Sequence, residues 1–345
     1  AKLRKADKSP RPPGWNLSPR AVRDFVCGSK KPAITRKFYG DDVMIERAII
    51  GLAGNRGLML VGEPGTAKTM LSELLTAAIT GHTNLTIQGT SGTTEDQIKY
   101  SWNYALLLAE GPSPKSLVPA PLYHGMKEGK IVRFEEITRC APEIQDVLVS
   151  VLSDKTLMIP ELGEEDGIVR AQSGFNLLAT ANTRDRGVHE MSAALKRRFN
   201  FETVHPIRNL SLEIKLVTEE AGKLLEESGV GTKLPPDVVE LLVTAFHDLR
   251  EGVTVEGIQV EKPSSVMSTA EAVSVALTAG LDAHYYGDGK MNAESVARHL
   301  ATGVLKDDPE DVKKLKHYVD GVVRKRAESK GGEWSTFLKA KKWLP

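Results

Sequence analysis

The segment from residue 57 to residue 75 constrains the fold of this chain more than any other. An apolar run, 57–61, leads into Gly62-Glu63-Pro64-Gly65-Thr66-Ala67-Lys68-Thr69-Met70, and a helical pattern follows through Leu75. A buried strand, a glycine-containing turn and a helix in this order favour an α/β fold, because such a helix packs back onto its sheet. The alternative interpretation is an ordinary Gly/Pro turn before a helix.

The turn itself is typical of a phosphate-binding loop. Glycines let the backbone approach a polyphosphate, and the N–H groups at the start of the next helix point at it with the positive end of the helix dipole. Lys68 is expected to reach the β- and γ-phosphates of ATP, and Thr69 to hold Mg²⁺ through its hydroxyl. Ala67 replaces the glycine of the strict loop pattern. The residues expected to bind the nucleotide are Gly62, Glu63, Pro64, Gly65, Thr66, Ala67, Lys68, Thr69 and Met70.

Short apolar runs alternate with helical stretches between residues 17 and 206, which predicts a parallel sheet covered by helices. The segment 17–53 is expected to be helical, and the expected strands are 57–61, 85–88, 130–134, 175–180 and about 201–204. Beyond Pro206 only amphipathic stretches follow, so 207–345 is expected to form an all-helical lid domain with a C-terminal tail. Those stretches are 211–228, 235–250, 264–281, 291–305 and 309–327.

The first sixteen residues are basic and contain prolines, which predicts a flexible tail that buries no core. An interaction arm is the alternative. Near the other end, Trp334, Phe337 and Leu338 share helical spacing, and three lysines precede Trp343. Packing on the lid itself is the preferred interpretation of these aromatic residues, and docking on a partner or on nucleic acid is the alternative.

Composition argues against several classes of protein. The net charge is +1, from 46 basic and 45 acidic side chains, which disfavours nucleic acid as a partner, and no global field draws the chain to an anionic membrane. The apolar runs are shorter than the ~18 residues of a membrane span. The two cysteines, Cys27 and Cys140, make no disulfide framework, which together with the expected use of ATP predicts a cytoplasmic protein. The histidines lack metal-binding spacing, and no Gly-x-Ser-x-Gly motif is present.

Two adjacent carboxylates end the expected strand 130–134. In phosphate-loop ATPases the first acid at such a strand end supports Mg²⁺ and the second polarises the attacking water, so Glu135 is the candidate metal ligand and Glu136 the candidate catalytic base. Glutamate stands at 135 where aspartate is commoner, and its extra methylene either moves the magnesium contact or routes it through water. A solvated strand end is the alternative for this pair.

Polar residues after two further elements complete the candidate site. Asn182 follows the expected strand 175–180 and can hold the attacking water, because an amide presents both a donor and an acceptor. Arg197 and Arg198 precede the last strand, where an arginine can stabilise charge on a neighbouring subunit's γ-phosphoryl group. We expect at least one of the two to act in trans. The alternatives are a turn or cap asparagine and a solvated basic helix end.

The order of these motifs resembles the AAA+ ATPases, and within them the MoxR family. The resemblance rests on 62–69, a Gly-x-Pro-Gly-x-Ala-Lys-Thr loop in which alanine is the family's own choice, and on 134–142, 178–182 and 194–199. It covers about residues 35–280. It implies a ring, expected to be hexameric, with ATP between subunits, chaperone-like remodelling of a protein partner, and a partner that carries a von Willebrand factor A domain.

The resemblance also implies two insertions and one departure. Segments 102–128 and 156–170 match insertions that in related rings project toward the pore or the partner face, the second as a hairpin turning at 163–167. Relatives carry a sensor arginine on the first lid helices, whereas this chain has Lys262-Pro263-Ser264 there. Two rival functions stay open: a nucleic-acid motor or loader, and a nucleotide-gated scaffold with little turnover.

Overall fold

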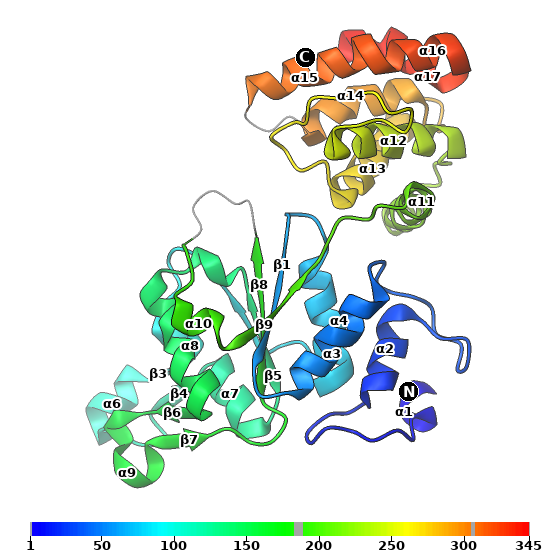
Figure 1. Cartoon of the computed structure of the whole chain (residues 1–345). Helices are drawn as coiled ribbons and strands as arrows, with labels where there is room; N and C mark the ends of the chain where they lie inside the picture. Colours follow the sequence, from blue (N-terminus) through cyan, green and yellow to red (C-terminus); the bar gives the residue numbers. More distant parts are fainter. Residues whose placement is uncertain (1, 183–188, 305–307, 345) are drawn as a thin grey trace. The chain divides into compact units, whose positions relative to one another are not determined.

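The computed structural model describes residues 2–182, 189–304 and 308–344, and the chain divides into two compact units (Figure 1). The first unit comprises Ala1–Glu63 and Ala67–His205, and the second comprises Pro64–Thr66 and Pro206–Pro345. The main division lies between His205 and Pro206, one residue before the boundary that the sequence pattern predicts between residues 206 and 207.

A parallel sheet forms the centre of the first unit. Among the described residues it has five strands in the order β2-β5-β8-β1-β9, and every neighbouring pair is parallel. The prediction of an α/β fold with a parallel sheet, followed by a helical region, is confirmed. The strands are β1 (Gly57–Gly62), β2 (Thr86–Gln88), β5 (Ile131–Glu135), β8 (Asn176–Asn182) and β9 (Phe199–Thr203).

Period-two alternation along β1 explains why helices cover both faces of this sheet. Leu58 and Leu60 point into a core shared with α2, α3 and α4, whereas Met59 points into a second core with α7 and α8. All three side chains are fully buried. Figure 1 shows α3 and α4 lying along one side of the sheet. The covering helices are α2 (Pro19–Cys27), α3 (Asp42–Ala53), α4 (Lys68–Thr80), α7 (Pro121–Glu128) and α8 (Pro142–Asp154).

Two segments interrupt the alternation of strand and helix. The first forms α5 (Glu95–Ile98), then β3 (Tyr100–Trp102), α6 (Tyr104–Glu110) and β4 (Leu117–Pro119), with β3 and β4 antiparallel. The second contains β6 (Thr156–Met158) and β7 (Ile168–Arg170), which pair antiparallel across η2 (Pro160–Leu162) and α9 (Gly163–Asp166). The second insertion is therefore a hairpin over the residues for which the sequence predicts one.

The N-terminal segment packs against the first unit, which corrects the prediction of a solvated flexible tail over residues 1–16. Residues Lys2–Ala6 form α1, whose Leu3 is buried, and Trp15 is buried as well. Asp7 accepts hydrogen bonds from the Ser18 backbone N–H at 2.8 Å and from the Ser18 hydroxyl at 2.6 Å. Composition could not show these contacts, because each depends on a partner elsewhere in the chain.

The helical pattern expected over residues 17–53 is two helices rather than one stretch. Helix α2 ends before Gly28, whose φ of 84° an L side chain rarely adopts, and α3 begins after Asp41, whose carboxylate accepts from the Val43 N–H. Between them Ser29 and Ile34 form an isolated antiparallel bridge. The backbone between the two helices therefore contains a turn closed by this bridge, where the sequence predicts a helix.

The second unit is helical in its described residues and has its own core. Val239, Leu242 and Phe246 of α12 are fully buried at its centre. Leu305, the last residue of one predicted helix, lies outside the described residues. The helices are α11 (Leu210–Glu227), α12 (Pro236–Glu251), α13 (Thr269–Tyr285), α14 (Ala293–Val304), α15 (Pro309–Tyr318), η3 (Val319–Val323), α16 (Arg324–Lys330), α17 (Gly332–Lys339) and η4 (Ala340–Trp343).

Two buried arginines in the second unit are paired with carboxylates. Arg250 donates to both carboxylate oxygens of Glu213, at 2.9 and 2.7 Å, and Arg326 donates to Asp248 at 2.6 Å.

Within the described part of the chain, no helix is long and apolar enough to cross a membrane.

Candidate functional site

The turn between β1 and α4 has the geometry of an anion-binding loop. Gly65 has a φ of 76°, and Ala67 adopts the left-handed conformation at φ 62° and ψ 32°. Ala67 is also the N-cap of α4 and makes no side-chain capping bond. The first amides of the helix therefore keep donors that a Ser or Asp cap would have occupied, and these donors suit a phosphate.

Lys68 is held inside this turn. Its side chain is buried, and its ammonium group donates to the carbonyl oxygens of Gly62 at 3.0 Å and of Glu63 at 2.8 Å. Thr69 follows on the first turn of α4, and Met70 is 45% exposed. The structure thus places the loop residues Gly62–Met70 between the end of β1 and the start of α4, where the sequence predicts them.

Glu135 is a buried carboxylate with hydroxyl groups around it. Ser72 donates to Oε1 at 2.5 Å, Thr180 donates to Oε2 at 2.7 Å, and the Thr69 hydroxyl lies 3.2 Å from the same oxygen. The Arg133 guanidinium lies 3.7 Å from Oε1 and is also buried. These contacts compensate the cost of burying a charge and fix the carboxylate beside Thr69.

This donor set fits a magnesium ion. Mg²⁺ prefers oxygen ligands at 2.0–2.1 Å in an octahedron, in which adjacent ligand oxygens lie roughly 2.9 Å apart. The separation of 3.2 Å between Thr69 Oγ1 and Glu135 Oε2 is close to that distance. The described residues contain no group of three or more His, Cys, Asp or Glu side chains suited to a metal. Such a site therefore relies on phosphate and water oxygens for its other ligands, as Mg²⁺ sites commonly do.

Glu136 follows Glu135 in the chain; its backbone shares Thr180 with that carboxylate, whereas its side chain has a different partner. Its backbone is left-handed, at φ 53°, and its N–H donates to the Thr180 hydroxyl at 3.0 Å. Its own carboxylate pairs with Arg139, whose Nε lies 2.7 Å from Oε2. The side chain keeps 35% of its surface exposed, so Glu136 is reachable from solvent while Glu135 is not.

Asn182 completes the same edge of the sheet. In the register of β1 and β8 it pairs with Gly62, the residue at which the loop begins. The structure thus brings Gly62, Glu135, Glu136 and Asn182 together at the carboxyl ends of three adjacent strands. This is the edge at which open α/β sheets bind their ligands.

The two arginines lie at the opposite end of the sheet. Arg198 directly precedes β9, and its carbonyl oxygen accepts from the N–H of Gly57, the first residue of β1. Gly62 stands five residues farther along β1, which at about 3.3 Å per residue places the arginines roughly 16 Å or more from the loop of their own chain. Neither arginine can therefore join the loop residues of the same chain.

The environments of the two arginines differ. Arg198 donates from Nε to the Ser153 hydroxyl and from Nη1 to the Ala194 carbonyl, both at 2.8 Å. Arg197 is exposed, and its side chain makes no hydrogen bond or ion pair with any described residue. Arg198 is therefore anchored within its own unit, whereas Arg197 presents its guanidinium group to the outside.

Four side chains around the candidate site were missed by sequence reasoning. Ser72, Arg133 and Thr180 surround Glu135, and Arg139 pairs with Glu136. Thr180 had a detectable signal, since it is a hydroxyl residue within a buried apolar strand. The others depend on register or on side-chain direction, which a motif does not encode.

The surroundings of Cys140 and Lys262, which lie near the motifs, are explained by packing. Burial raises the pKa of the Cys140 thiol, and a hydrogen bond with Thr93 only partly opposes this effect, so the thiol stays protonated at neutral pH. In the second unit, the stem of Lys262 lies against Gly252, where an added Cβ would come within 2.6 Å of Lys262 Cε. This packing does not by itself give Lys262 the role of the sensor arginine.

Comparison with known proteins assigns both units. Residues 57–199 match the AAA domain of the dynein-related subfamily, and residues 211–344 match the YehL-like AAA+ ATPase C-terminal domain. YehL of Escherichia coli (strain K12) is 49% identical over 345 residues, which cover 100% of this chain and 94% of that protein. The chain belongs to the YehL-like AAA+ ATPases. The AAA+ part of the resemblance is thereby confirmed.

More distant proteins share parts of the chain. YojN of Bacillus subtilis (strain 168) is 29% identical over 193 residues, which cover 53% of this chain and 59% of YojN. Among solved structures, NtrX from Brucella abortus in complex with ATP is similar with a TM-score of 0.50 at 13% identity, covering 90% of this chain and 69% of that one. This likeness concerns the fold alone.

Proposed function

We propose that the chain is a MoxR-type AAA+ ATPase that binds ATP and Mg²⁺ at Gly62–Met70 and hydrolyses ATP within a ring of copies, expected to be hexameric. The observation that carries this proposal is the separation of the catalytic groups. Glu135, Glu136 and Asn182 share one edge of the sheet with the loop, while Arg197 and Arg198 lie at the other end. The set becomes complete only when a second copy supplies an arginine.

The residues at the loop edge have distinct roles in this proposal. Lys68 exchanges its bonds to the Gly62 and Glu63 carbonyls for the β- and γ-phosphates, and Thr69 and Glu135 hold Mg²⁺. When bound there, Mg²⁺ would supply positive charge opposite the phosphate oxygens. Glu136 accepts the proton of the attacking water, and Asn182 orients that water with its amide.

Arg197 is our candidate for the trans-acting finger. A finger must leave its own domain and reach a neighbour's γ-phosphoryl group, which Arg197 can do because no described residue holds its side chain. Arg198 would have to give up its bonds to Ser153 and Ala194 first. We therefore assign catalysis in trans to Arg197 and a positioning role to Arg198.

Remodelling of a protein partner is the output that the MoxR resemblance implies, and the first insertion supports it. Helix α6 has no buried residue, and it exposes Tyr104 by 67% and Leu108 by 89%. These side chains are four residues apart and share one face of the helix, which suits contact with a client. The proposed client carries a von Willebrand factor A domain with a metal-dependent adhesion site, and the proposed location is the cytoplasm, where ATP is abundant.

The test combines two inactive variants. Lys68→Ala is expected to abolish nucleotide binding, and Arg197→Ala is expected to keep it while lowering kcat about 10³-fold. Mixing the two proteins should restore turnover, because a Lys68→Ala subunit still offers Arg197 to a neighbour with an intact loop. If no mixing ratio restores phosphate release, or if the protein turns over ATP as a monomer, the shared site is wrong.

Glu136→Gln tests the catalytic base separately. This variant should bind ATP as the parent does and release phosphate at least about 10²-fold more slowly. Turnover at the parent rate would remove Glu136 from its assigned role.

One observation favours a second candidate, a nucleotide-gated scaffold with little turnover. The ion pair between Glu136 and Arg139 occupies the carboxylate that would activate water. Phosphate release from an assembled ring separates the ATPase from the scaffold. A scaffold would bind ATP and assemble but would release almost no phosphate.

A further inference from the structure

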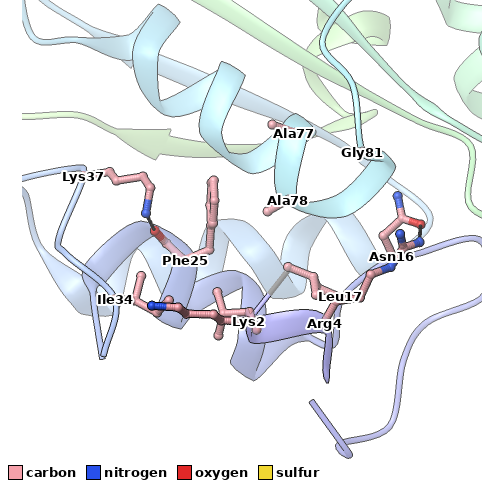
Figure 2. A pocket seen from close by; sticks show the side chains of 11 residues that line it. Lys2, Arg4, Asn16, Leu17, Phe25, Ile34, Lys37, Ala77, Ala78 and Gly81 are labelled. Carbon is pink, nitrogen blue, oxygen red and sulfur yellow. Dashed lines mark hydrogen bonds between the residues drawn. The ribbon is translucent and has the colours of Figure 1, made fainter. Parts of the chain in front are cut away.

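The first unit contains a cavity of about 410 Å³ that none of the loop residues 62–70 lines (Figure 2). It lies where α1, α2 and the C-terminal end of α4 meet. Its apolar wall consists of Leu3, Leu17, Phe25, Ile34, Ala77 and Ala78. Leu3, Leu17 and Ala78 are buried, so the wall belongs to the packed core rather than to a loose surface.

The polar groups at this cavity are all cationic or neutral. Lys2, Arg4, Lys37 and the Asn16 amide line it, and no Asp or Glu is among its lining residues in the described structure. None of the three cations forms an ion pair with a described carboxylate. Arg4 donates to Asn16 Oδ1 at 2.8 Å, and the Lys2 ammonium group has no partner among the described residues. The mouth of the cavity therefore carries positive charge that these residues do not neutralise.

The ammonium group of Lys37 likewise has no carboxylate partner among the described residues. Its ammonium group donates to the Phe25 carbonyl at 2.9 Å and lies 4.2 Å from the centroid of the Phe25 ring. Carbonyl and ring partners supply only partial negative charge, and burial lowers the pKa of Lys37. An anion brought beside this group would gain a charged partner that is partly shielded from water.

The size and lining of the cavity select the ligand. Small-molecule pockets occupy about 300–1,000 Å³ and combine apolar walls with a few polar groups, and this cavity matches both properties. A bound peptide would need backbone partners along a strand edge or a long groove, and none of the described lining residues belongs to a named strand. The combination fits a small molecule better than a chain.

We propose that this cavity is a binding site for a small amphiphilic carboxylate, whose apolar body lies against Leu17, Phe25 and Ala78 and whose carboxylate meets Lys2 and Lys37. Figure 2 shows these side chains around one space, with the Lys37 ammonium group at one side and Arg4 and Asn16 at the other. The site stands apart from the proposed ATPase function and does not depend on it.

Calorimetric titration of the full chain with sodium dodecanoate, below its micelle concentration, tests the site. We expect saturable binding of one molecule per chain. The double variant Lys2→Glu/Arg4→Glu should weaken binding at least tenfold. The matched control Lys5→Glu/Lys8→Glu changes the charge of the same segment equally but does not line the cavity, and it should change affinity less than threefold.

Two further measurements separate the contribution of the cavity volume from that of the ligand's charge. Ala78→Phe fills the cavity and should weaken dodecanoate binding at least tenfold, with circular dichroism to verify folding; if it does not fold, the charge variants decide. Dodecanol, which has the same chain without the charge, should bind at least tenfold more weakly than dodecanoate.

Each opposite outcome overturns the proposal. Absence of saturable binding, equal loss in the two double variants, or equal affinity for dodecanol would show that the cavity does not recognise an amphiphilic anion. A glutamate-rich peptide with a phenylalanine anchor that bound more tightly and displaced dodecanoate would assign the site to a peptide instead.

Discussion

The Thr180 hydroxyl group links the carboxylate of Glu135 to the backbone of Glu136. The hydroxyl donates to Glu135 Oε2 at 2.7 Å and accepts from the backbone N–H of Glu136 at 3.0 Å. Thr180 is 2% exposed, so water cannot readily replace either bond. Replacing Thr180 with valine keeps the branched shape and removes both bonds.

The cost follows from the two groups left behind. A hydrogen bond to a charged group contributes about 1.5–3 kcal/mol, and a buried donor without a partner costs about 1–3 kcal/mol. Ser72 still donates to Oε1 at 2.5 Å, which keeps the loss near the lower ends of these ranges. We expect Thr180→Val to destabilise the first unit by about 3 kcal/mol.

Hydrogen–deuterium exchange measures this change one unit at a time. A loss of about 3 kcal/mol corresponds to exchange about 100-fold faster for the protected amides of β5 and β8. Amides of α12, in the second unit, serve as an internal reference and should keep their rates. Thr180→Ser retains the hydroxyl and should stay within about tenfold of the parent.

The reasoning would be refuted if the amides of β5 and β8 in the Thr180→Val variant exchanged at rates within threefold of those in the parent protein. It would also fail if Thr180→Ser exchanged as fast as the valine variant, since retaining the hydroxyl group would then give these amides no protection.

Three further predictions concern other sites. Arg139→Ala should raise the basal rate of phosphate release by up to about fivefold, because the ion pair that occupies Glu136 is partly exposed and contributes at most ~1 kcal/mol; a lower rate in a steady-state assay would instead make Arg139 a supporting residue. Ala67→Gly should raise the free energy of unfolding by about 1 kcal/mol in urea, since glycine adopts φ 62° without strain, whereas Ala109→Gly in α6 should lower it or leave it unchanged. Burial raises the pKa of Asp311, but hydrogen bonds from Ser264, Lys314 and Ser265 outweigh it and lower the pKa to about 2 from an ordinary value of 3.8. The folded pKa is thus the lower one, so this carboxylate stabilises the protein above about pH 4 and loses its effect as the pH falls toward about 2. Asp311→Asn should therefore cost about 2 kcal/mol in urea unfolding at about pH 7 and almost nothing near pH 2; an equal cost at both pH values would contradict the assignment.

The sheet was predictable because its strands are buried on both faces. Runs such as Leu58-Met59-Leu60 are apolar without interruption, as a strand covered by helices on both faces requires. The positions of Glu135 and Asn182 followed from the same pattern, since parallel strands end at one edge. The order of the strands and their register did not follow, because no local signal in the sequence fixes which strands pair.

The N-terminal region shows where local patterns fail. Its charge and prolines indicate a chain that cannot bury a core, yet Leu3 and Trp15 find apolar partners supplied by later helices. The hydroxyl groups around Glu135 pose the same difficulty at the site, because Ser72 and Thr180 are 108 positions apart in the sequence and meet at one carboxylate. Both cases depend on tertiary contacts.

The distance along β1 between Gly57 and the loop has a kinetic consequence if the proposed trans mechanism holds. A solitary copy would retain bound nucleotide without consuming it, so the specific activity of a solution would fall on dilution and rise steeply as chains meet. The rate of ATP hydrolysis would then rise more than proportionally with the concentration of the protein. A cell that contained few copies would hydrolyse little ATP, because few of those copies would be assembled.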